Sequence, residues 1–162
     1  MIIIGYPGIG KSTLVKQNRQ IDGHGFIDLE SSHFSHFNAT EKWYIQYCNV
    51  AISLHEQGFY VFVSSHKEVI KNLMERVPEE CMFVYPDIKL KDEWIEKLRE
   101  RWINSADPAE ETKNKRAYDR VNKHFDEDIQ ELMLRSKYRD KVVLKCMDYN
   151  LYVELLLKLI KN

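Results

Sequence analysis

The residues most able to do chemistry in this chain form a glycine-rich segment near its start. Residues 5–12 read Gly-Tyr-Pro-Gly-Ile-Gly-Lys-Ser, the G-x-x-x-x-G-K-S pattern of a phosphate-binding loop. Glycines let the backbone turn its N–H groups inward toward phosphate oxygens. Lys11 would then reach the β- and γ-phosphates of ATP, and the Ser12 hydroxyl would bind Mg²⁺. The residues predicted to contact the triphosphate are Gly5, Gly8, Ile9, Gly10, Lys11, Ser12 and Thr13.

Two acidic residues, Asp28 and Glu30, follow an apolar run at residues 25–29. Residues two apart point to the same side of a strand if the strand continues. Paired carboxylates at a strand end suit Mg²⁺ or a substrate hydroxyl. The alternative is that these acidic residues only form the turn that follows the strand. We expect Asp28 to share the metal with Ser12, partly through water, and to act on the acceptor that Glu30 helps to bind. Which carboxylate is the base stays open.

Arginines supply candidate cations for the transferring phosphoryl group. Arg99 and Arg101 flank the predicted buried face of one helix, and Arg116 and Arg120 follow on a segment that could swing. A planar guanidinium suits the charge that develops on phosphoryl oxygens, whereas any single arginine also fits an ordinary surface charge. We expect Arg99 to have the catalytic role and Arg101 and Arg116 to bind substrate. The predicted buried face consists of Ile95, Leu98 and Trp102.

Other residues near the strand ends are harder to assign. Phe34 precedes a predicted helix and could stack on a base or line an acceptor pocket. The run Ser64-Ser65-His66 follows an apolar strand where many triphosphatases place an aspartate, which shifts the metal and base roles toward Asp28 and Glu30. We interpret His66 as polar surface at a helix start.

Short apolar runs alternate with helical spacing along the whole chain, which favours a parallel sheet covered by helices on both faces. Helices are expected after the loop at 13–20, between Asn38 and Gly58, and around the apolar residues of 69–74, 94–102, 125–133 and 152–159. The predicted strands are 2–4, 25–29, 60–64, 81–85 and 142–146. The expected fold is α/β, a three-layer P-loop NTPase domain over 1–162 with a five-stranded parallel sheet and a helical lid.

About half of residues 87–123 are charged, and residues 104–115 have almost no apolar content. Such a run fits either a solvated face or a lid that closes over bound triphosphate. We take 87–123 as the candidate lid.

Composition restricts the partners. The 162 residues include 24 basic and 25 acidic ones, so no overall basic field favours nucleic acid. Three scattered cysteines suggest reduced thiols. The predicted first strand starts near Met1, so we expect no leader peptide. The apolar run at 151–160 is shorter than the roughly 20 residues that span a bilayer. We expect a cytoplasmic protein, a monomer or homodimer, that acts on a small molecule and does not enter a membrane.

These motifs resemble those of the P-loop nucleoside and nucleotide kinases. Residues 5–13, with a proline before the middle glycine, resemble the loop of nucleoside monophosphate kinases, and Asp28-x-Glu30 is similar to the acidic pair of shikimate and gluconate kinases. Leu98-Arg99-x-Arg101 looks like the start of their lid, and the whole, with residues 61–66, looks most like small phage-type nucleotide kinases. The resemblance implies triphosphate, metal and transition-state roles for Lys11, Ser12 and Arg99, while Asp28 would orient or deprotonate the acceptor.

The chain departs from the monophosphate kinases at Ser64 and in the short segment between its second and third predicted strands, which leaves the acceptor open. The leading hypothesis is transfer of the γ-phosphoryl of ATP to a nucleoside monophosphate or nucleoside. A nucleotide-dependent switch or ATPase is the alternative, but the tetrapeptides 114–117 and 122–125 lack the aspartate of the guanine-reading N-K-x-D motif. A polynucleotide 5′-kinase would need a local basic groove.

Overall fold

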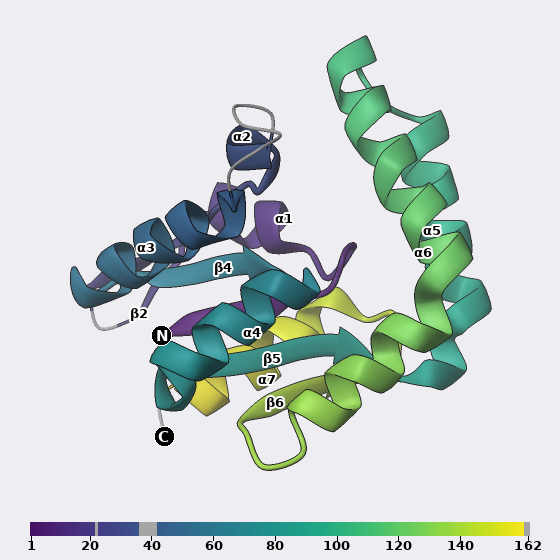
Figure 1. Cartoon of the computed structure of the whole chain (residues 1–162). Helices are drawn as coiled ribbons and strands as arrows, with labels where there is room; N and C mark the ends of the chain where they lie inside the picture. Colours follow the sequence, from purple (N-terminus) through teal and green to yellow (C-terminus); the bar gives the residue numbers. More distant parts are fainter. Residues whose placement is uncertain (22, 36–41, 161–162) are drawn as a thin grey trace.

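Five parallel strands and one short antiparallel strand form the central sheet (Figure 1). The computed structural model describes residues 1–21, 23–35 and 42–160. The strand order is β2-β3-β4-β1-β5-β6, and the described pairs are parallel except β2–β3. The strands are β1 (Ile2–Gly5), β2 (Gln20–Ile21), β3 (His24–Asp28), β4 (Tyr60–Ser64), β5 (Cys81–Pro86) and β6 (Lys141–Leu144). The predicted α/β fold and its five parallel strands are thereby confirmed.

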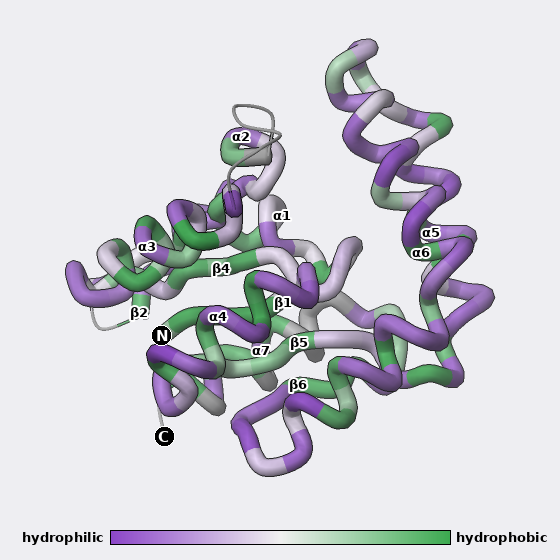
Figure 2. The backbone as a smooth tube through the Cα atoms, in the orientation of Figure 1, coloured by the Kyte–Doolittle hydropathy of each residue, from purple (hydrophilic) through white to green (hydrophobic). Residues whose placement is uncertain are grey.

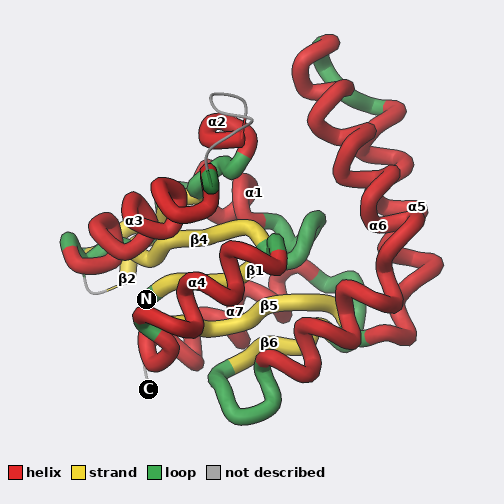
Figure 3. Tube along the Cα trace, viewed as in Figure 1, coloured by secondary structure: helices red, strands yellow, loops and turns green. Residues whose placement is uncertain are grey.

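Helices connect the strands (Figure 3). They are α1 (Lys11–Lys16), α2 (Ser32–Ser35), α3 (Trp43–Glu56), α4 (Lys67–Arg76), α5 (Lys91–Ile103), α6 (Pro108–Arg135) and α7 (Tyr149–Ile160), with 3₁₀ turns η1 (Pro78–Glu80) and η2 (Ile88–Leu90). The predicted helix at 13–20 ends early because Asn18 adopts a left-handed φ of 49°, and the chain then forms β2, which was not predicted. The predicted helix between Asn38 and Gly58 corresponds to α3. Its expected start at Asn38 lies outside the described residues, while its stop at Gly58 is confirmed by a φ of 96° just past α3.

The sheet is the core of the molecule. Ile2, Ile3 and Ile4 of the central strand β1 are fully buried, and β4 and β5 are almost as apolar. Strands covered on both faces read as continuous apolar runs, because neither side of the sheet meets water. In Figure 1, α4 lies in front of the sheet and α7 behind it, and Figure 2 shows the strands as the hydrophobic part of the chain. The loop that follows β1 is therefore attached to a fully buried strand in the middle of the sheet.

Helices α5 and α6 form an antiparallel pair that extends beyond the edge of the sheet (Figure 1). We call this pair the α5–α6 hairpin. Figure 2 shows hydrophilic residues along much of this hairpin, with hydrophobic ones among them. Asp107 caps α6 by accepting hydrogen bonds from the N–H groups of Ala109 and Glu110, at 2.9 and 2.8 Å. Trp102 stacks on Tyr118 between the helices, with ring centroids 5.4 Å apart. The charged stretch is therefore mostly solvated helix, and its closure as a lid stays a prediction.

Within the described ranges, no helix combines the length and apolar character that crossing a bilayer requires.

Candidate active site

The glycine-rich loop joins β1 to α1 and needs its glycines. Gly8 and Gly10 have φ angles of 88° and 89°, a region that side chains with a Cβ rarely adopt. A Cβ on Gly5 would lie 2.6 Å from Ile9 Cδ1, and one on Gly8 would lie 3.1 Å from Trp94 Nε1. The loop is therefore folded tightly around its own Ile9 side chain and against α5, and these positions have no room for a Cβ.

Lys11 is held at the centre of a group of charges. Its Nζ donates to the carbonyl oxygen of Gly5 over 2.9 Å. Burial lowers the pKa of Lys11 from its ordinary value, while the carboxylates of Asp28 and Glu30 raise it and the cations of Lys113 and Arg101 lower it further. These four side chains therefore lie close enough to act on the same ammonium. They come from β3, from the segment just after it, and from the α5–α6 hairpin.

Ser12 and Asp28, the two predicted metal ligands, are in direct contact. The Ser12 hydroxyl donates to Asp28 Oδ2 over 2.7 Å. Asp28 is the last residue of β3, so the sheet fixes its position relative to the loop. The described residues contain no group of three or more acidic, histidine or cysteine ligands around one point. Mg²⁺ usually takes one or two protein oxygens and completes its shell with waters and substrate phosphates, so this oxygen pair fits it.

Glu30 lies beyond the end of β3 and forms an ion pair with Lys113 of α6. The strand thus stops before the position at which it would place both carboxylates on one face. Lys113 was not predicted from the sequence, because it sits in a charged run without any apolar periodicity. The ion pair brings α6 to the acidic end of β3.

A buried tyrosine ties together the two strand ends that carry these residues. The Tyr47 hydroxyl donates to the carbonyl of Leu29 over 2.7 Å and accepts from the N–H of Ser64 over 2.9 Å. Phe34 packs edge-on against the Tyr47 ring, with centroids 5.2 Å apart. The predicted aromatic residue Phe34 therefore lies beside the segment that carries the acidic pair.

Replacing Tyr47 by phenylalanine should lower the free energy of unfolding by about 1–3 kcal/mol, because it removes the partner of a part-buried carbonyl and a part-buried N–H. Urea unfolding of the variant measures this loss. The matched control is Tyr138→Phe, since the Tyr138 side chain is 84% exposed. Equal stability of the two variants would contradict a bracing role for the Tyr47 hydroxyl.

The predicted arginines occupy different surroundings. Arg101 is exposed and acts electrostatically on Lys11, as described above. Arg99 is half exposed and donates to Glu96 Oε1 on its own helix over 3.0 Å. Arg116 is exposed on α6, and within the described part of the chain no hydrogen bond or ion pair connects it to the loop. The structure thus brings Arg101 toward the loop and does not bring Arg99 or Arg116 there.

A tryptophan and a lysine of α5 hold the outer side of the loop, and sequence reasoning missed both roles. Trp94 Nε1 donates to the carbonyl of Pro7 over 2.8 Å, and Lys97 Nζ donates to the carbonyl of Gly8 over 3.0 Å. The Lys97 ammonium also lies 4.4 Å from the centre of a Trp94 ring. Together with Leu98 and Arg101 these residues follow i, i+3, i+4, i+7 spacing, which was the available signal for a face turned toward the loop.

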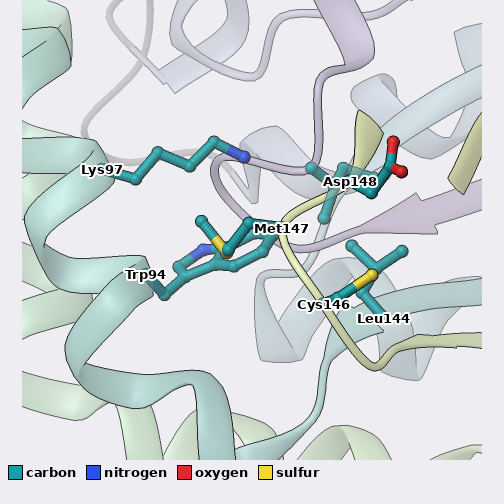
Figure 4. A pocket seen from close by; sticks show the side chains of 7 residues that line it. Trp94, Lys97, Leu144, Cys146, Met147 and Asp148 are labelled. Atoms are coloured by element: carbon teal, nitrogen blue, oxygen red, sulfur yellow. The ribbon is translucent and has the colours of Figure 1, made fainter. Parts of the chain in front are cut away.

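A small pocket lies beside this face (Figure 4). In the figure, Trp94 and Lys97 project from α5 toward the segment that follows β6. The lining combines apolar side chains with charged groups at Lys97 and Asp148. The lining residues are Ile9, Trp94, Lys97, Leu144, Cys146, Met147 and Asp148. Because Ile9 belongs to the loop, the pocket adjoins the phosphate-binding backbone.

The fold is similar to that of a known kinase. The crystal structure of shikimate kinase from Bacteroides thetaiotaomicron superposes with a TM-score of 0.53 at 13% sequence identity, over 99% of this chain and 97% of that one. The chain therefore has a P-loop kinase fold of the shikimate kinase type, and the predicted membership of this structural class is confirmed at the level of the fold. No family model matches the sequence, and no curated protein matches it.

Proposed function

We propose that this protein is an ATP-dependent phosphotransferase that moves the γ-phosphoryl group to a small acceptor, a nucleoside monophosphate or nucleoside. The observation that carries the proposal is the hydrogen bond between Ser12 and Asp28, at 2.7 Å. It joins the phosphate-binding loop to a carboxylate at the carboxyl end of β3, beside Lys11. A cation, a hydroxyl and a carboxylate at one edge of a parallel sheet are what a phosphoryl-transfer site requires.

On the donor side, the loop N–H groups and Lys11 would hold the β- and γ-phosphates. Ser12 and Asp28 would hold Mg²⁺, which supplies charge neutralisation between the phosphates when bound. Of the two arginines of α5, Arg101 is the better placed to approach the triphosphate, because it acts electrostatically on Lys11.

On the acceptor side, the reacting oxygen would lie between the loop and the acidic pair. A bond forms between this oxygen and the γ-phosphorus as the bond from the γ-phosphorus to the β–γ bridging oxygen breaks, which releases ADP. A hydroxyl acceptor would pass its proton to Asp28, whereas a phosphate acceptor has no proton that must be removed. Glu30 would hold the acceptor once Lys113 moves away or shares the carboxylate, and Phe34 would border the same space.

The test is a panel of acceptors measured by stimulated ADP release from Mg²⁺–ATP. Nucleoside monophosphates, nucleosides, sugar acids and an oligonucleotide with a 5′-hydroxyl are compared at equal concentration. Stimulation by a nucleoside monophosphate or nucleoside, with matching formation of a phosphorylated product, is the expected result. Stimulation by the oligonucleotide alone would identify the protein as a polynucleotide 5′-kinase. Slow ATP hydrolysis that no acceptor accelerates would identify it as a nucleotide-dependent switch.

A further inference from the structure

His66 lies between β4 and α4, close to the phosphate-binding loop. It follows β4 directly after Ser64 and Ser65 and caps the start of α4. Ser64 is paired in register with Gly5, the first residue of the phosphate-binding loop. The ring of Trp43 meets the imidazole edge-on, with centroids 5.4 Å apart, and Lys11 acts on it electrostatically. His66 is therefore part of the edge of the sheet at which the loop and the acidic pair meet, and our interpretation of it as polar surface was incomplete.

Arg120 of α6 fixes the orientation and the tautomer of this imidazole. Its guanidinium is held by Asp128, with Nε 3.2 Å from Oδ2, and lies 2.7 Å from His66 Nδ1 through a terminal nitrogen. A guanidinium can only donate hydrogen bonds, so Nδ1 must be the acceptor. The proton of the neutral ring then sits on Nε2. Imidazole nitrogens point in nearly opposite directions, so this N–H faces away from Arg120.

The charge state of the ring supports this assignment. Burial, with a smaller effect from the Arg120 cation, lowers the pKa of His66 to about 4, against the opposing pull of Glu68 and Asp128. The ring is therefore neutral near pH 7. One nitrogen is occupied by Arg120 and the other already carries a proton, so His66 has no free lone pair with which to accept a proton from a substrate. It can donate a hydrogen bond but cannot serve as the general base.

We propose that the Nε2–H of His66 donates a hydrogen bond to an oxygen of the phosphoryl acceptor, and that Arg120 serves as the positioning residue that orients this donor. The inference rests on the proposed function, since it concerns the acceptor of that reaction. It adds a neutral donor just after β4, the strand that pairs with β3 at Asp28. The acceptor group that it fits is an oxygen with a free lone pair, such as a phosphate oxygen of a nucleoside monophosphate.

A role limited to packing is the competing explanation, because the contact with Arg120 also docks α6 onto the start of α4. Two substitutions separate these roles. In His66→Asn the amide oxygen lies near the former Nδ1 and can still accept from Arg120, but the outward donor is lost. In His66→Gln the amide reaches the former Nε2 and can donate outward, but the contact with Arg120 is lost. His124→Asn on α6 is the control, since its ring is 42% exposed.

The experiment measures kcat and the KM values for acceptor and ATP, together with the thermal unfolding midpoint. We expect His66→Asn to raise the acceptor KM about tenfold, the loss of one neutral hydrogen bond to a ligand, at unchanged ATP KM and midpoint. We expect His66→Gln to keep the acceptor KM within about threefold of wild type and to lower the midpoint.

A wild-type acceptor KM in His66→Asn would overturn the inference and leave His66 as a docking residue. So would parallel losses in both variants that follow their unfolding midpoints, or a change confined to the ATP KM. These outcomes presuppose that the wild-type enzyme responds to an acceptor in the panel. If none stimulates it, the proposed function fails first and the inference falls with it.

Discussion

Replacing Lys11 with alanine should reduce phosphoryl transfer by about a thousandfold or more, because charge stabilisation around the transferring group supplies most of the rate in this class of reaction. The fold should survive. Burial lowers the pKa of Lys11 in the folded protein, so the unfolded chain binds this proton more tightly. The cation therefore opposes folding at pH values below its folded-state pKa, and removing it does not remove a stabilising charge.

The measurement is acceptor-stimulated ADP release, with thermal unfolding recorded on the same samples. Lys16→Ala is the matched control, because Lys16 is an exposed lysine on the same short helix. It should keep wild-type activity. If the Lys11→Ala variant turns over at a rate within about threefold of wild type, Lys11 does not stabilise the transition state and the loop does not take part in the reaction.

Replacing Asp28 with asparagine should lower kcat by about a hundredfold or more while changing the affinity for ATP little. Asparagine keeps an oxygen that can accept from the Ser12 hydroxyl, so the hydrogen bond that joins loop and sheet can persist. What is lost is the negative charge that would hold Mg²⁺ and attract the acceptor proton. The substitution therefore tests the charge of this residue separately from its contribution to the fold.

Steady-state kinetics with the best acceptor and calorimetry with a non-hydrolysable ATP analogue distinguish the two effects. Asp119→Asn serves as the control, since Asp119 pairs with Lys115 on the exposed side of α6 and makes no contact with the loop among the described residues. Unchanged kcat in Asp28→Asn would move the metal and proton roles to another group, and Glu30 is then the next residue to replace. Weaker ATP binding alone would restrict Asp28 to the donor site.

The α5–α6 hairpin connects the donor and acceptor sides of the site. Trp94 and Lys97 fix α5 to the loop, and Arg120 fixes the middle of α6 to His66. Nearer the start of α6, Lys113 pairs with Glu30, where we expect the acceptor. Because an acceptor held by Glu30 would compete with Lys113, acceptor binding and the position of this hairpin would be coupled. Closure of residues 87–123 as a lid stays a prediction.

The amino-acid sequence by itself determined the phosphate-binding loop, the five parallel strands and the position of Asp28 at a strand end. Each of these is local. The loop is a contiguous pattern whose glycines are required by the backbone, as the left-handed φ angles at Gly8 and Gly10 confirm. Apolar runs such as residues 2–4 reveal buried strands because both faces of the sheet exclude water. Asp28 could be placed because the residue that ends a parallel strand lies at the ligand-binding edge of the sheet.

Only the tertiary structure decided which distant polar groups complete the site. Lys113 and Glu30 are 83 residues apart, Trp94 and Pro7 are 87, and Arg120 and His66 are 54. Nothing local marks Lys113 or Arg120, because a polar side chain on a solvated helix has the same sequence pattern whether it faces water or a cleft. Packing of α5 and α6 against the sheet selects Arg101 over Arg99 for the loop, since a helix turns about 100° per residue and only one of them can face it.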